Sequence, residues 1–239
     1  MGFGVGGVAA VAALGGPAIA ATSTAPKPRD VAAARSMVTA LTRFDQEALA
    51  RENAVTAAAK AAVAQVQTGC PGAIPKSAQD GTGTQRAVVQ DLLTEGALDV
   101  SLAANEPLAG PLRVVATRLA GAHFSSRALS RAFSRTAQAN RFVLSLRPTD
   151  LCADVTAAAA DGFDADPTAT TSALKHVATL SSSHALALSL IPSKLAPYLG
   201  ATRERSALAH LKTLNGRYVS AIQGTELTWE RKLGSALDE

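Results

Sequence analysis

A chain of 239 residues with 47% apolar side chains is long enough to bury a core, yet only 4% of its residues are aromatic. Alanine, the strongest helix former, is the commonest apolar residue, and no stretch alternates apolar and polar residues as a strand would. The formal charge of +4 is modest, and the scarcity of aromatic rings argues against base stacking on single-stranded nucleic acid. We therefore expect an all-α protein without a nucleic-acid partner.

The first segment has the features of an export signal. Residues 1–25 contain no charged side chain, and their apolar run ends at Gly15-Gly16-Pro17 before an Ala-x-Ala pattern. The run is shorter than the ~20 residues of a membrane-spanning helix. We predict a signal peptide, and hence a secreted or envelope-associated protein outside the cytoplasm. No Lys or Arg precedes the run, so the positively charged segment that usually opens a signal peptide is missing. An uncleaved N-terminal anchor is the main alternative, and membrane contact is expected only in that case.

Residues 26–239 are predicted to form one domain, a single up-and-down bundle of about five or six helices. Asp30 can cap the first helix, which runs to residue 67 with apolar residues every seven positions. Asp45 and Glu52 interrupt a neighbouring line on the same face. Proline and glycine residues delimit the later helices, which we expect over residues 84–105, 112–146, 150–160, 167–190 and 202–237, with Gly121 a point where the third can kink or split.

The two cysteines occupy predicted helix ends. Cys70 follows the first long helix, and Cys152 opens the short helix after Pro148. In an exported chain two cysteines predict one disulfide. In the chain-entropy model, closing the loop between Cys70 and Cys152 stabilises the folded state by about 4–5 kcal/mol. The alternative, two free buried thiols, would fit a cytosolic protein.

The helix expected over residues 112–146 is rich in arginine and contains no acidic residue. Four of its arginines fall in one narrow sector of a helical wheel and form a candidate anion-binding face for anionic polymers of the cell envelope. Acidic segments before and after this helix favour pairing within the chain or plain solvation instead. The four candidate residues are Arg113, Arg127, Arg131 and Arg135.

Two histidines lie on or near apolar helix faces and are candidates to bind a small apolar ligand or haem. They are His123 and His184, although a histidine on such a face is more often a satisfied core residue. The aspartates of residues 161–166 lack the twelfth-position Glu of an EF-hand and are better explained as helix caps. No hydrolase, phosphate-loop or metalloprotease motif occurs, so no catalytic residue, metal site or cofactor is predicted.

A resemblance rests on the two cysteine contexts, Cys70-Pro71 and Pro148-Thr149-Asp150-Leu151-Cys152-Ala153-Asp154. Together with the signal-like segment and the long first helix, they resemble a group of exported, alanine-rich helical proteins of high-GC actinobacteria that have no assigned activity. The resemblance covers most of residues 30–237. It implies an extracytoplasmic helical protein with a disulfide, and it supplies no catalytic residue. A structural or binding role, with the partner open, is therefore the expected function.

Overall fold

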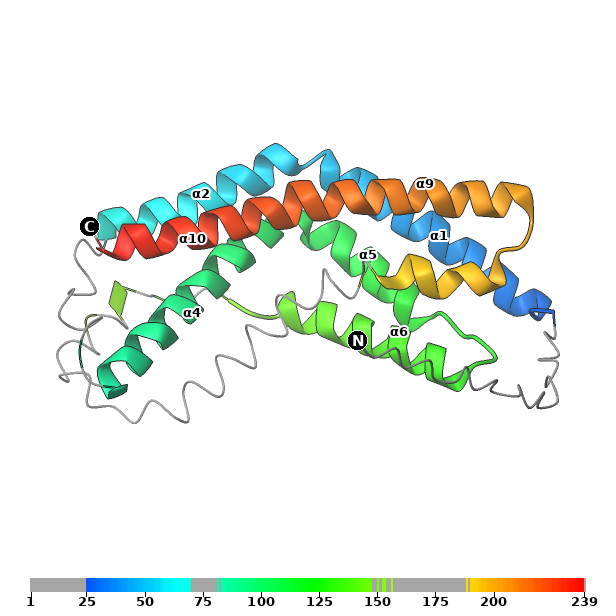
Figure 1. Cartoon of the computed structure of the whole chain (residues 1–239), viewed down its shortest axis with the longest axis horizontal. Helices are drawn as coiled ribbons and strands as arrows, with labels where there is room; N and C mark the ends of the chain where they lie inside the picture. Colours follow the sequence, from blue (N-terminus) through cyan, green and yellow to red (C-terminus); the bar gives the residue numbers. More distant parts are fainter. Residues whose placement is uncertain are drawn as a thin grey trace, which may run out of the picture.

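The computed structural model describes residues 25–69, 81, 83–147, 150, 152, 153, 156, 188 and 190–238. These residues are helical without strands, which confirms the all-α prediction for this part of the chain. Two long rods dominate the shape (Figure 1). The first rod is α1 (Pro28–Leu49) followed by α2 (Glu52–Gly69). The second rod is α9 (Thr202–Tyr218), the π-helical segment η3 (Val219–Gln223) and α10 (Gly224–Asp238).

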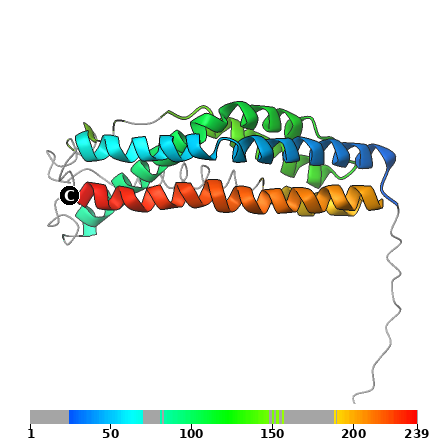
Figure 2. The same cartoon turned by 90° about the horizontal axis from the view of Figure 1, so that it is seen from above.

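The two rods lie side by side and run in the same direction (Figure 2). Helix α1 packs on α9, and α2 packs on α10. At the start of both rods Arg35 forms an ion pair with Glu204. Near the middle, the rings of Phe44 and Tyr218 meet edge to face with centroids 5.4 Å apart. These two contacts link α1 to α9 at two places along the pair.

The first rod is not the single helix that its sequence predicts, because it breaks at Ala50 and Arg51. The Arg51 N–H donates to the carbonyl of Ala48 at 2.9 Å, which tightens the turn. The Arg51 guanidinium donates to the carbonyl of Glu47 at 2.8 Å and so satisfies the acceptor beside the break. Glu52 is exposed directly after the break, whereas Val55, on the predicted apolar line, is fully buried.

A second layer covers the inner side of the rods. It begins with α4 (Gly83–Asn105), the short 3-10 turn η1 (Glu106–Leu108) and α5 (Ala109–Ala120). Helix α4 packs against α2 and α10, and α5 packs against α1. Three leucines anchor this layer, since Leu108, Leu112 and Leu119 are all at most 1% exposed. Among the described residues no helix is long and apolar enough to cross a membrane.

The helix predicted over residues 112–146 is split into two. Helix α5 ends at Ala120, and α6 spans Arg127–Val143, packed back against α5 (Figure 1). Ser126 caps α6 by accepting the N–H of Leu129 at 3.3 Å. The carboxylate of Asp30, in the first turn of α1, accepts the Ser125 N–H at 2.8 Å and ties the connecting loop to the first rod.

The helices predicted over residues 150–160 and 167–190 fall mostly outside the described residues. Where the chain is described, the Asp150 carboxylate accepts the N–H of Ala153 at 3.2 Å, as expected for a helix start. Cys152 is half-buried and packs against the core. Cys70 lies outside the described residues, so its disulfide with Cys152 stays a prediction.

Candidate functional site

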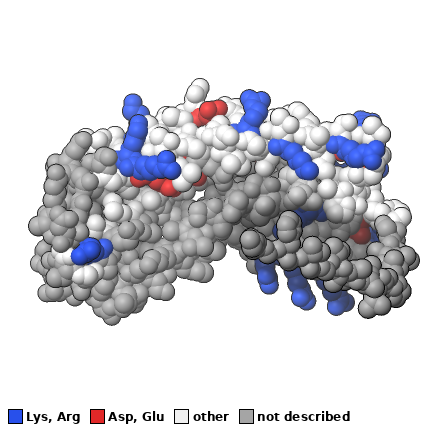
Figure 3. Space-filling view, viewed as in Figure 1, with Lys and Arg blue, Asp and Glu red and all other residues white. Residues whose placement is uncertain are grey.

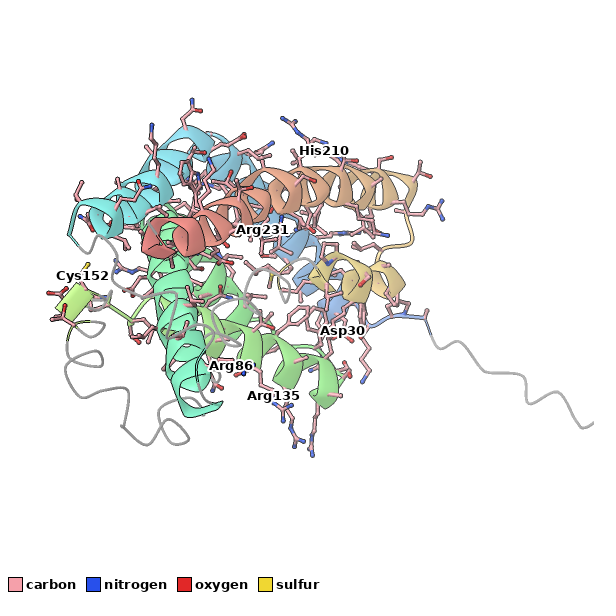
Figure 4. The ribbon with its side chains drawn as sticks, turned by 60° about the vertical axis from the view of Figure 1, so that its left-hand side comes forward. Asp30, Arg86, Arg135, Cys152, His210 and Arg231 are labelled. Carbon is pink, nitrogen blue, oxygen red and sulfur yellow. The ribbon has the colours of Figure 1, made fainter. Side chains whose placement is uncertain are left out.

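The four arginines predicted to share one face are divided by the break between α5 and α6. Arg113 lies on α5, whereas Arg127, Arg131 and Arg135 lie on α6, and all four are exposed. We call the three on α6 the arginine row. Basic side chains project from the lower edge of the protein in Figure 3, and Arg135 points away from the body in Figure 4. The structure therefore brings three of the four candidates together.

The arginine row carries an electrostatic cost within the described structure. Helix α6 contains no acidic residue, and no described carboxylate forms an ion pair with the row. Like charges four residues apart destabilise a helix by roughly 0.2–0.5 kcal/mol per pair. Arg127 also occupies the first turn of α6, where the helix dipole disfavours a cation. An anion placed along this face would relieve both effects.

The pair of inward histidines is not formed as predicted. Because α5 ends at Ala120, His123 lies in the loop before α6 and is exposed, so the prediction that it faces the core is wrong. Phe124 takes the inward place and packs edge to face on Phe133, with ring centroids 5.3 Å apart. His184 lies outside the described residues.

A cleft of about 780 Å³ opens between α2, α4, η1, α5 and the C-terminal end of α6. The described residues of its walls are mostly alanine and leucine and include two arginines, Arg113 and Arg147. Sequence reasoning missed this cleft because its lining comes from segments far apart in the chain. The described lining includes Ala58, Ala61, Ala62, Ala103, Asn105, Glu106, Arg113, Leu144, Leu146 and Arg147.

Asn105 in the cleft wall is 3% exposed and bonded through one end of its amide. Its Nδ2 donates to the carbonyl of Ser101 and to Oε1 of Glu226, each at 2.8 Å. Because the Ser101 carbonyl can only accept, the bond to it shows that the N–H groups of the Asn105 amide are at the Nδ2 end. The opposite atom, Oδ1, is buried and has no hydrogen-bond partner among the described residues.

Behind Asn105, the half-buried Glu226 and the buried Asp45 act electrostatically on the buried Tyr218. Burial raises the pKa of Glu226 to about 8, and the neighbouring Glu230 adds to the effect. Burial likewise raises the pKa of Asp45 to about 7, against a hydrogen bond from Asn215 that lowers it. Burial, and then the charges of Glu226 and Asp45, raise the pKa of the Tyr218 hydroxyl. One sign of these polar groups is present in the sequence, since Asp45 interrupts a line of apolar residues on the first helix.

Among the described residues, no group of three His, Cys, Asp or Glu side chains could hold a metal ion. Comparisons with family models, with curated proteins and with solved structures give no match.

Proposed function

We propose that this chain is an exported, non-enzymatic helical protein that binds anionic polymers of the cell envelope through the arginine row of α6. The observation that carries the proposal is the row itself. Arg127, Arg131 and Arg135 are exposed on one side of a helix, and no described carboxylate neutralises them.

The spacing of the row suits a polymer better than a single small anion. Residues four apart on a helix are separated by about 6 Å along its axis, so the three guanidinium groups form a repeating set of cations. A polyanion can neutralise several of them at once and release its condensed counterions, which gives affinity that falls steeply with salt. A lone small anion would meet one or two of them.

The proposal includes a location outside the cytoplasm and a disulfide between Cys70 and Cys152. They are supported by the signal-like segment before residue 26 and by Cys152, which is half-buried against the core as a structural cystine would be. Mass spectrometry of the intact exported protein without reductant tests both. We expect a cleaved N-terminus and a mass lacking two hydrogens, and free thiols at Cys70 and Cys152 would contradict the disulfide.

Binding of fluorescently labelled polyphosphate, followed by anisotropy at several salt concentrations, tests the proposed function. In the variant Arg127→Gln/Arg131→Gln/Arg135→Gln we expect at least about tenfold weaker binding and a salt dependence reduced by about two to three charges. The matched control removes three exposed arginines of α9, Arg203, Arg205 and Arg217, and so makes the same change in net charge.

Equal losses in the two triple variants would show that binding follows net charge rather than the row, and would refute the proposal. So would binding that does not weaken with added salt. Labelled dextran, an uncharged polymer, should not bind any of the proteins.

A further inference from the structure

We propose that the cleft between α2, α4, η1, α5 and α6 binds an amphiphile with one apolar chain and an anionic head group. This site is separate from the arginine row and does not depend on the proposed function. Its volume of about 780 Å³ lies within the roughly 300–1,000 Å³ of small-molecule sites.

The apolar part of the cleft fits an alkyl chain. Small side chains at Ala58, Ala62 and Ala103 leave room between α2 and α4, where larger residues would fill the space. Leu144 and Leu146, at the end of α6, line the cleft and are only half-buried. An apolar chain covering these side chains would remove their exposed surface from water, a gain that grows with the area covered.

The charged part of the cleft favours an anion at its edge. Arg113 is exposed and has no ion-pair partner among the described carboxylates. Nη1 of Arg147 donates to the carbonyl of Leu146 at 2.8 Å, which holds this second guanidinium in place. Against these two cations, the described lining residues include one carboxylate, that of Glu106. A carboxylate or phosphate head group would therefore form charge-assisted hydrogen bonds here, with Arg113 first.

Displacement of a fluorescent fatty acid, dansylaminoundecanoic acid, from the full chain tests the site. We expect dodecanoate and dodecyl phosphate, each below its micelle concentration, to displace the probe, and dodecanol to do so at least about fivefold more weakly.

Two pairs of variants locate the binding. Arg113→Gln should weaken dodecanoate binding at least about fivefold, with partial recovery in Arg113→Lys, whereas Arg118→Gln, on the same helix but outside the cleft, should not. Ala61→Trp should obstruct the cleft and abolish displacement, whereas Ala64→Trp should leave it intact. Ala61 and Ala64 are both exposed on α2, so neither change disturbs the core, and thermal unfolding verifies the fold.

Three results would overturn the proposal. Dodecanol binding as tightly as dodecanoate would show nonspecific apolar adsorption. Unchanged binding in both Arg113→Gln and Ala61→Trp would place the probe elsewhere. Lost amphiphile binding in the triple variant of the arginine row would move the site to α6, whereas polyphosphate binding in that variant reports separately on the proposed function.

Discussion

Nδ2 of Asn105 donates a hydrogen bond to Oε1 of Glu226 over 2.8 Å, and this bond joins the end of α4 to α10 behind the cleft. Burial raises the pKa of the Glu226 carboxyl from 4.5 to about 8, so the group is protonated at neutral pH. The contact is therefore between a neutral acid and an amide, and it changes character when the acid ionises.

Replacing Glu226 by Gln should stabilise the protein in alkaline solution. The folded state holds a proton at pH values where the unfolded chain has released it, because the folded pKa exceeds the ordinary one. The stability that the neutral acid contributes is therefore fully present below about pH 4.5 and is lost as the pH rises to about 8. Urea unfolding at about pH 9 should show Glu226→Gln more stable than the native chain by on the order of 3 kcal/mol. Near pH 4 the two should differ little.

Asp45 should act in the same direction over a lower pH range. Its side chain is 1% exposed, and its pKa is raised from 3.8 to about 7. Its stabilising contribution is therefore lost as pH rises from about 4 to about 7. Asp45→Asn, which can still bond to Asn215, should raise the free energy of unfolding at about pH 8 by roughly 2 kcal/mol.

The combined variant Asp45→Asn/Glu226→Gln checks the assignment of both groups. Its free energy of unfolding should vary much less with pH between about 4 and about 8 than that of the native chain. A pH profile as steep as the native one would show that other groups control the dependence.

The helices were predictable because their signals are local. Apolar spacing and proline punctuation indicated α4 over residues 84–105, close to the observed Gly83–Asn105. No proline or glycine marks the break at Arg51. At this break the Arg51 side chain bonds to the carbonyl of Glu47, a contact that apolar spacing does not indicate. Gly121 marked where the third predicted helix can split, but the turn there also depends on Asp30, a residue distant in sequence.

The candidate site was less predictable than the helices. The helical wheel placed Arg113 and Arg127 on one face because it assumed a continuous helix. The loop between α5 and α6 interrupts that helix, so the two residues lie on different helices. The same loop carries His123 into solvent. The cleft and the bond between Asn105 and Glu226 depend on tertiary packing, which a single sequence does not specify.

Asp30 should be a sensitive position at the start of the first rod. It is 3% exposed, and its carboxylate accepts the N–H of Ser125. Asp30→Ala would leave that N–H without a partner and should lower the free energy of unfolding by about 2 kcal/mol. Asp30→Asn keeps an acceptor and should cost less than half as much. Equal losses in urea unfolding would show that the charge of Asp30, rather than its hydrogen bond, is what stabilises the loop.

Arg51 should contribute more to stability than Arg43, although both approach Glu47. Arg43 is 77% exposed and forms an ion pair with the Glu47 side chain at 2.6 Å. Exposed pairs of this kind are worth roughly 0–0.5 kcal/mol, so Arg43→Ala should change little. Arg51 is half-buried and donates to the Glu47 carbonyl at the break between α1 and α2.

Arg51→Ala would remove the side-chain donor at that break and should cost about 1–1.5 kcal/mol in urea unfolding near neutral pH. The ion pair of Arg43 weakens with added salt, whereas the bond from Arg51 to a neutral carbonyl does not involve a second charge. The difference between the two variants should therefore persist in about 1 M salt. If the Arg51→Ala loss disappeared there, its origin would be the more distant contact with the Glu47 carboxylate, at 3.9 Å, rather than the carbonyl.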